Sequence, residues 1–145
     1  MDNSNDKLKI YSCSIPEKGS LPVAGMKIAA GFPSPADDFC EGELNLNSLL
    51  VKHPASTFFA RVSGEGMRNE AIRNGDILVV DRAVEPYDGC IAVCHLDGEF
   101  TIKRIKTDGK KLWLLTTNTD FKPIEVNEAS NFAVWGIVLY SISKH

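Results

Sequence analysis

The fold is indicated most clearly by residues 91–105, which read Ile-Ala-Val-Cys-His-Leu-Asp-Gly-Glu-Phe-Thr-Ile-Lys-Arg-Ile. Two apolar, strand-like runs flank Asp97-Gly98, and an Asp-Gly pair between such runs is a strong signal for a β-hairpin. Side chains alternate between the two faces of a strand, so Lys103 shares a face with Thr101 and Ile105. This stretch therefore predicts an antiparallel pair of strands with a lysine in the second.

The other apolar runs are also short, and turn signals separate them. Asn74-Gly75-Asp76 precedes one run, Asp88-Gly89 another, and Asp108-Gly109 a third. The runs that we expect to be strands are 57–62, 77–80, 90–96, 99–105, 111–115 and 132–142. Closely spaced strands with repeated Asp-Gly turns predict a mainly β chain, folded as a small, strongly bent sheet or partial barrel.

Two segments before residue 57 fall outside this pattern. Residues 44–51 predict one short helix, with Asn45 as N-cap, Pro54 beyond its end and leucines on one face. We interpret the helix as a lid over one end of the barrel. Residues 1–30 contain no convincing periodic element, because proline and glycine interrupt them repeatedly. On composition alone they are typical of a flexible terminal tail.

The composition excludes several classes of protein. A chain of 145 residues is most simply one domain, and its net charge of -3 argues against a protein that mainly grips DNA phosphates. No apolar run approaches the roughly 20 residues that span a bilayer. The acidic, polar start is not a secretory signal, so we expect a cytoplasmic protein. The four cysteines lack paired CxxC spacing, and we expect them to be reduced. We find no metal motif and no phosphate-binding loop, and we expect no cofactor.

Three motifs in order carry a resemblance to a known family. They are Ala30-Gly31-Phe32-Pro33-Ser34-Pro35, Ser63-Gly64-Glu65-Gly66-Met67 and Glu99-Phe100-Thr101-Ile102-Lys103-Arg104. Together they resemble the LexA/UmuD family of Ser-Lys autopeptidases, most closely its UmuD branch of SOS mutagenesis proteins. The resemblance covers about residues 28–142. It implies the family's C-terminal peptidase fold for residues 31–145 and an extended N-terminal arm for residues 1–30.

The resemblance also implies roles for individual residues. It implies self-cleavage between Ala30 and Gly31, with Lys103 as the general base. It implies that Gly66 stands at the nucleophile position, where the family has serine. The residues expected to line the cleft around this position are Ser63, Gly64, Glu65 and Met67.

The glycine at position 66 decides whether this chemistry can run. A serine hydroxyl attacks the scissile carbonyl while a neutral lysine takes its proton, and glycine has no hydroxyl with which to form an acyl-enzyme. Ser63 lies three residues upstream, so its side chain should be displaced by several ångströms, whereas attack needs the reacting atoms about 3–3.5 Å apart. We therefore predict that this polypeptide does not cut itself, whether Gly66 is natural or introduced.

The partners implied by the resemblance are a second copy of the chain, a Y-family translesion polymerase of the UmuC type, and a RecA filament on single-stranded DNA. Direct sequence-specific DNA binding is not expected, because there is no room for a helix-turn-helix before residue 30. The apolar run 132–140 also favours a homodimer, although a strand buried on both faces within a monomer would explain it equally well. Two alternatives stay open: an active serine hydrolase that uses Ser63 or another serine, and a non-catalytic partner of an active paralogue.

Overall fold

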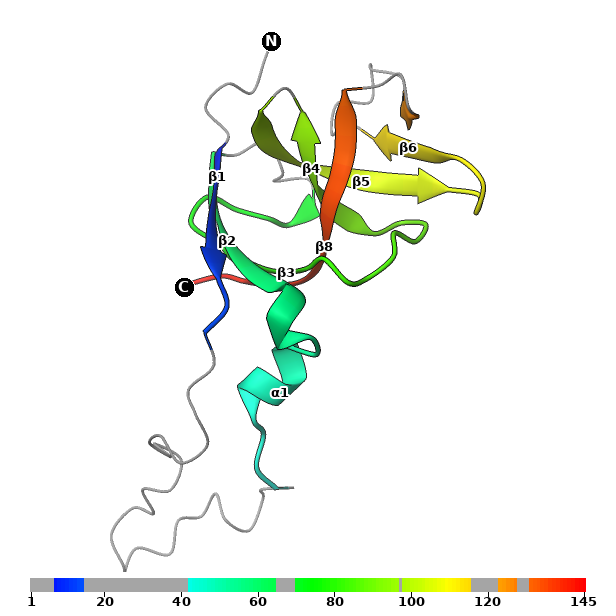
Figure 1. The fold of residues 1–145 in the computed structure, drawn as a ribbon. Helices are drawn as coiled ribbons and strands as arrows, with labels where there is room; N and C mark the ends of the chain where they lie inside the picture. Colours follow the sequence, from blue (N-terminus) through cyan, green and yellow to red (C-terminus); the bar gives the residue numbers. More distant parts are fainter. Residues whose placement is uncertain (1–6, 15–41, 65–69, 97, 116–122, 128–130) are drawn as a thin grey trace, which may run out of the picture.

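The computed structural model describes residues 7–14, 42–64, 70–96, 98–115, 123–127 and 131–145. Within these residues, eight strands form one sheet in the order β1-β2-β3-β8-β4-β5-β6-β7 (Figure 1). Every neighbouring pair is antiparallel. The elements are β1 (Lys7–Ser12), α1 (Leu46–Leu50), the 3₁₀ turn η3 (Pro54–Ser56), β2 (Thr57–Ser63), β3 (Ile77–Asp81), β4 (Ile91–Leu96), β5 (Glu99–Thr107), β6 (Leu112–Leu115), β7 (Ile124–Val126) and β8 (Phe132–Ile142). The predicted mainly β fold is confirmed.

The six runs predicted as strands correspond to β2, β3, β4, β5, β6 and β8. Two strands were not predicted. One is β7, and the other is β1, which lies inside the segment 1–30 that was expected to hold no periodic element. It pairs with β2 over its whole length, from Lys7 opposite Ser63 to Ser12 opposite Phe58. The first part of the N-terminal segment therefore belongs to the sheet. Residues 15–41 lie outside the described part of the chain.

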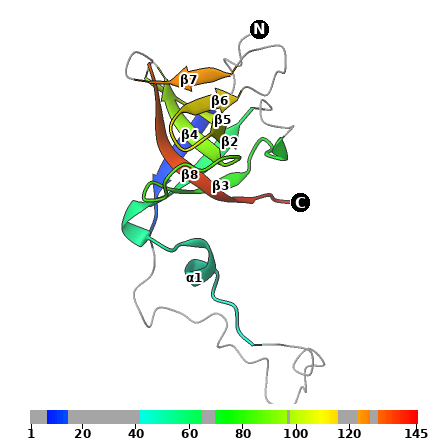
Figure 2. The same cartoon turned by 90° about the vertical axis from the view of Figure 1, so that its right-hand side faces the viewer.

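The sheet is strongly bent but does not close. Strand β8 lies between β3 and β4, and its pairing shifts register once on each side. Leu139 is the extra residue opposite β3 and Trp135 the extra residue opposite β4. Such bulges bend a strand and increase its twist, and Figure 2 shows β8 as one long curved strand. As a result β1 comes within 8 Å of β5, measured between Cα atoms, although the two strands do not pair.

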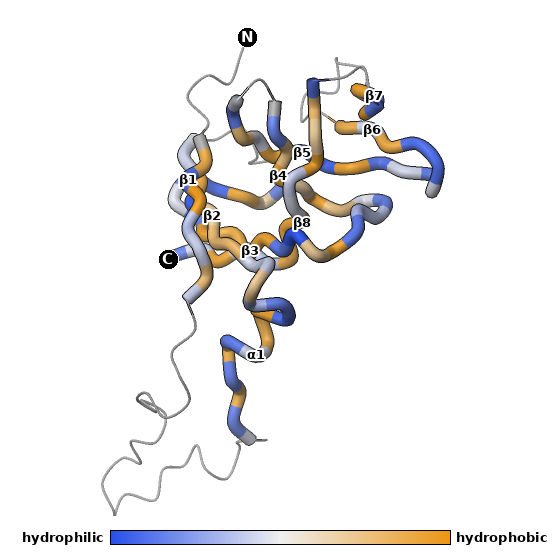
Figure 3. The backbone as a smooth tube through the Cα atoms, in the orientation of Figure 1, coloured by the Kyte–Doolittle hydropathy of each residue, from blue (hydrophilic) through white to orange (hydrophobic). Residues whose placement is uncertain are grey.

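Two apolar clusters form the core, one on each face of the sheet, and Figure 3 shows apolar residues along all the central strands. The inner cluster lies within the curl between β1 and β5, and its buried members are Ala60, Val62, Ile72, Leu78, Val80, Val93, Ile102 and Val138. The outer cluster lies on the opposite face of β4, β5 and β8, and its buried members are Cys90, Ala92, Cys94, Ile105, Leu114 and Ile137. The described cysteines Cys13, Cys90 and Cys94 are free thiols, and Cys40 lies outside the described residues.

The apolar run in β8 is explained within one chain. Gly136, Ile137 and Val138 are buried where β8 packs between its two neighbours. A Cβ atom on Gly136 would lie 2.7 Å from Cγ1 of Val80, so the packed Val80 side chain leaves no room for a side chain at this position. The run consequently gives no separate support for a homodimer, and that expectation rests on the family resemblance.

The helix forms as predicted but does not act as a lid. Asn45 caps α1 by accepting a hydrogen bond from the Ser48 backbone N–H at 3.2 Å. No residue of α1 is buried, and Leu46 and Leu49 remain 60% and 38% exposed. Both views draw the helix below the sheet rather than against either apolar cluster (Figures 1 and 2). The spacing of the leucines indicated a covered face that the structure does not have.

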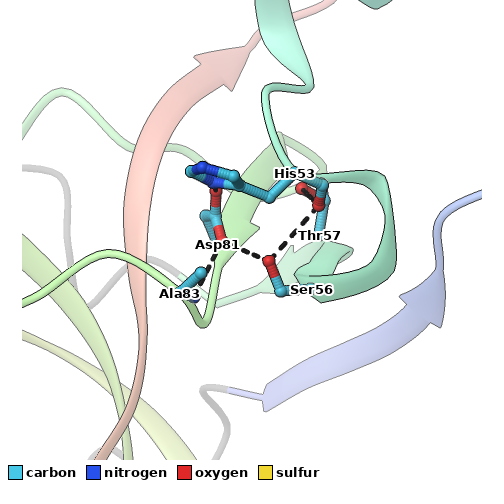
Figure 4. Close-up of polar contacts among 5 residues, drawn as sticks. All are labelled: His53, Ser56, Thr57, Asp81 and Ala83. Atoms are coloured by element: carbon cyan, nitrogen blue, oxygen red, sulfur yellow. Dashed lines mark hydrogen bonds and ion pairs between the residues drawn. The ribbon is translucent and has the colours of Figure 1, made fainter.

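A buried carboxylate fixes the turn that leads into β2. Asp81 ends β3 with no solvent exposure (Figure 4). Its Oδ1 accepts hydrogen bonds from Ser56 Oγ and from the Ala83 N–H, both at 2.8 Å. Its Oδ2 lies 2.6 Å from Nδ1 of His53. Burial alone would raise the pKa of Asp81, but the contacts with His53, Ala83 and Ser56 outweigh it and hold the pKa below the ordinary 3.8.

We predict that Asp81→Ala lowers the free energy of unfolding by about 2–4 kcal/mol at pH 7, because it removes the buried carboxylate that binds Ser56, Ala83 and His53 together. The folded-state pKa of Asp81 is below the unfolded value, so the carboxylate stabilises the fold above about pH 3.8 and this contribution fades as the pH falls through the folded pKa. The difference between the two proteins should therefore be smaller at pH 3 than at pH 7, in urea unfolding followed by tryptophan fluorescence.

Glu85→Gln is the matched control, because Glu85 is exposed and its loss removes the same formal charge. Its unfolding free energy should stay within about 0.5 kcal/mol of the original at both pH values. An equal loss for Asp81→Ala at pH 3 and pH 7 would show that the charge of Asp81 contributes nothing.

Candidate functional site

The predicted general base, Lys103, lies in the middle of β5, where it pairs with Ala92 of β4. It is partly buried and shares its strand face with Thr101 and with Ile105 of the outer cluster. The alternation derived from the sequence is therefore confirmed. Burial raises the pKa of the nearby Cys94 thiol to about 12, and the positive charge of Lys103 offsets only part of that rise.

Ser63 and Gly64 mark the point where the chain leaves β2. Ser63 is the last residue of the strand and pairs with Lys7 of β1. Gly64 follows at φ 106°, a conformation that favours glycine, and its N–H donates to Oδ1 of Asn74 at 2.9 Å. Ser63 is thus fixed in the sheet, while the backbone turns away immediately after it.

The other predicted site residues lie outside the described part of the chain. They are Ala30, Gly31, Glu65, Gly66 and Met67. The roles of Gly66 as nucleophile position and of Ala30-Gly31 as the cleavage site remain predictions, as does the role of Lys103 as base.

The chain on both sides of residues 65–69 is held by several contacts. The Gly75 N–H donates to the Val62 carbonyl at 2.8 Å, and the Val62 N–H donates to the Asp76 carbonyl at 2.9 Å. Asp76 is buried, and its carboxylate accepts from the Arg73 N–H at 2.9 Å and from Ser143 Oγ at 2.7 Å. Residues 70–76, which follow the undescribed stretch, are therefore bound both to the end of β2 and to the C-terminal end of the chain.

An ion pair connects residues 70–76 directly to β5 through Glu70. Nε of Arg104 donates to Oε2 of Glu70 at 2.8 Å, and Nη2 donates to the same oxygen. Nη1 of Arg104 donates to the Gly89 carbonyl. The hydrogen bond to Glu70 raises the pKa of Arg104 further, so the guanidinium stays charged. Because Arg104 follows Lys103, β5 carries the predicted base and also binds Glu70 through the next residue.

Glu70 was not identified from the sequence. It lies 34 positions from Arg104, and no local pattern relates residues so far apart. An acidic residue a few positions after the Ser-Gly-x-x-Met motif was the available signal.

A second arrangement, of Ser56, Asp81 and His53, tests the alternative that another serine is the nucleophile. In a serine–histidine–aspartate triad the imidazole lies between the hydroxyl and the carboxylate. Here Asp81 lies between them, bound to Ser56 through Oδ1 and to His53 through Oδ2 (Figure 4). Ser56 Oγ also contacts the His53 carbonyl rather than its ring. Among the described residues no imidazole is positioned to activate Ser56, so we interpret the cluster as structural.

Two further classes of site are absent from the described residues. No group of three or more His, Cys, Asp or Glu residues in them could hold a metal ion. No helix among them is long and apolar enough to cross a membrane.

Comparison with known proteins supports the resemblance seen in the motifs. The Peptidase S24-like family model matches residues 22–139. Protein ImpA of Salmonella typhimurium is 41% identical over 123 residues, which cover 85% of this chain and 83% of that protein. Protein MucA of Escherichia coli is 41% identical over 128 residues, covering 87% and 86%. The LexA repressor of Acidithiobacillus ferrooxidans is 39% identical over 133 residues, covering 90% of this chain and 64% of the repressor. The chain belongs to the Peptidase S24-like family, and so to the LexA/UmuD type that its motifs predicted.

Proposed function

We propose that this protein is a UmuD-like accessory subunit of a Y-family translesion polymerase, with a self-cleavage apparatus that lacks only its nucleophile. The observation that carries the proposal is a glycine at position 66 in a chain that belongs to the Peptidase S24-like family. In this proposal residues 1–30 form the arm and residues 31–145 the peptidase-fold domain. The protein acts in the cytoplasm as a homodimer, and a RecA filament promotes removal of the arm where a nucleophile is present.

The described residues support the chemical part of the proposal. Lys103 is partly buried on a central strand, an environment that suits a general base better than a fully solvated position does. Ser63 ends β2 with its backbone paired to β1, three residues before Gly66. It therefore makes a poor substitute nucleophile, because attack requires a separation of about 3–3.5 Å from the scissile carbon.

The ion pair between Glu70 and Arg104 supports a fixed spacing between the two halves of the site. Glu70 comes four residues after Gly66, and Arg104 comes one residue after Lys103. Arg104 also binds the Gly89 carbonyl, so its position is set from two sides. In the proposed site this contact keeps the nucleophile position at a constant distance from the base.

We predict that Gly66→Ser restores cleavage between Ala30 and Gly31. General-base activation needs a hydroxyl oxygen within about 2.6–3.2 Å of the lysine nitrogen, and serine supplies that oxygen. Loss of the nucleophile in a serine peptidase costs on the order of a million-fold in rate, so the contrast with the original chain should be complete. Cleavage should be faster at alkaline pH, because only neutral lysine accepts a proton. Intact-mass spectrometry after long incubation at about pH 10 measures both effects.

Gly66→Ser combined with Lys103→Ala is the matched control, since it keeps the new hydroxyl and removes the base. It should remain intact, as should the original chain. Cleavage of the original chain would contradict the loss of the nucleophile. A folded Gly66→Ser protein that stays intact would show that more than one hydroxyl is missing.

A second prediction concerns Arg104 in the Gly66→Ser background. Arg104→Gln should slow self-cleavage by about 10- to 100-fold, because a displacement of 1 Å can cost about 100-fold. The charge-swapped pair Glu70→Arg with Arg104→Glu should recover part of the rate. Lys106→Gln is the control, since Lys106 is exposed on the same strand, and it should change the rate less than about twofold.

Amide hydrogen exchange at Ile72 gives a reading that does not depend on cleavage. Ile72 is buried in the inner cluster two residues after Glu70, and Arg104→Gln should accelerate its exchange. Unchanged exchange together with an unchanged cleavage rate would remove the ion pair from the proposed mechanism.

The polymerase partnership predicts a complex. A tagged copy of the chain, co-expressed with the Y-family polymerase encoded closest to its gene, should retain that polymerase through purification. A replicative polymerase expressed in the same way is the control and should not be retained. Failure to retain any Y-family polymerase from the same genome would favour the alternative of a partner for an active paralogue.

A further inference from the structure

Among the described residues, strand β1 is paired along one side only. It is the first strand of the sheet, and its backbone pairs with β2 at six successive positions, Lys7 to Ser12 against Ser63 to Phe58. Its other side approaches β5 without pairing. Figure 1 shows it as the blue strand beside β2. Within the described part of the sheet, removal of this strand would therefore break one ladder of backbone hydrogen bonds, the one with β2.

The side chains of β1 alternate between the core and the solvent. Leu8 and Ile10 are partly buried and pack against the inner cluster. Lys9 and Tyr11, which point to the other face, are exposed. The strand is thus held by its backbone and by two apolar side chains, in the way that an added strand binds to a sheet edge.

The space that β1 occupies is lined by apolar residues that would become exposed to solvent without it. Val62 of β2 and Ile102 of β5 are buried members of the inner cluster, and they come from the two strands that flank β1. Without β1, the edge of β2 would present unpaired N–H and C=O groups beside this apolar surface. Such an edge readily accepts another extended segment.

We propose that β2, together with the facing part of β5, forms a strand-binding slot, and that residues 7–12 occupy it as a detachable strand that stays bound after the chain is cut between residues 15 and 41. The occupant is the chain's own N-terminal segment. The proposal goes beyond the function given above, because the slot holds the strand whichever protease makes the cut and whether or not position 66 is active.

It follows that cutting and release are separate events. A cut removes the covalent tether, but the six backbone pairs and the two apolar side chains still hold the strand. Once the tether is cut, the bound strand becomes an independent ligand that dissociates and can be exchanged for a peptide of the same pattern. The surface of the inner cluster opens only at that later step.

The test uses the full chain with a thrombin recognition sequence inserted after Lys18. The folded protein is nicked and then passed over a gel-filtration column, and mass spectrometry reports whether the N-terminal fragment elutes with the domain. The inward variant carries Leu8→Asp and Ile10→Asp. The outward variant carries Lys9→Asp and Tyr11→Asp, which places the same new residues in the same strand on the exposed face.

The unmodified and outward proteins should retain the fragment after nicking, and the inward variant should lose it at least tenfold faster. Tryptophan fluorescence before nicking reports whether each variant is folded. Immediate release from the unmodified protein would overturn the proposal. Equal release from the inward and outward variants would overturn it as well.

If the inward variant is unfolded before nicking, exchange replaces it as the test. A labelled peptide of residues 1–14, added in excess to the nicked unmodified protein, should enter the slot and displace the original fragment. The same peptide with Leu8→Asp and Ile10→Asp should not enter. Entry of both peptides, or of neither, would refute a slot that recognises the inward face of residues 7–12.

Discussion

The pairing of β8 with both β3 and β4 is the constraint on which the rest of the structure depends. It is the only strand in the described chain that connects the β1-β2-β3 part of the sheet with the β4-β5-β6-β7 part. Its two bulges, at Trp135 and Leu139, turn these parts towards each other. The close approach at Gly136 limits that crossing to a residue without a side chain. The separation between the end of β2 and the middle of β5, where the two halves of the candidate site originate, is therefore set by the curvature of a strand that contributes no residue to the site.

Much of this fold could be predicted because its strands are bounded by local signals. Asp-Gly and Asn-Gly turns separate runs with the right period, so six strands and the cap of α1 followed from neighbouring residues. Strand β1 did not, because its alternation spans six residues and only its packing against the inner cluster gives Leu8 and Ile10 a partner. The lid interpretation of α1 was wrong for a related reason. Leucines on one face indicate burial only where another element covers them, and here none of the helix is buried.

In the candidate site, too, some features followed from local sequence and others depend on how distant residues pack together. The strand face of Lys103 followed from alternation, whereas the role of Gly66 stays a prediction because position 66 lies outside the described residues. The ion pair of Glu70 with Arg104 and the contact of His53 with Asp81 join residues 34 and 28 positions apart. Whether residues so far apart in the sequence come into contact depends on how the sheet curls, and no local sequence pattern encodes that curvature. His53 shows the limit well, since its position before Pro54 gave no sign that it would meet a fully buried carboxylate.

The thiol of Cys94 lies near the predicted base, Lys103, and its position there has a chemical consequence. A sulfhydryl close to a lysine ammonium is ordinarily a candidate for a reactive thiolate, because the positive charge favours the ionised form. In this chain burial prevails and raises the pKa of Cys94 to about 12. At neutral pH roughly one molecule in 10⁵ then carries the thiolate, as a gap of about five pH units requires. The protein thus keeps sulfur near its lysine in the form of a protonated thiol, which is a weaker nucleophile than the thiolate.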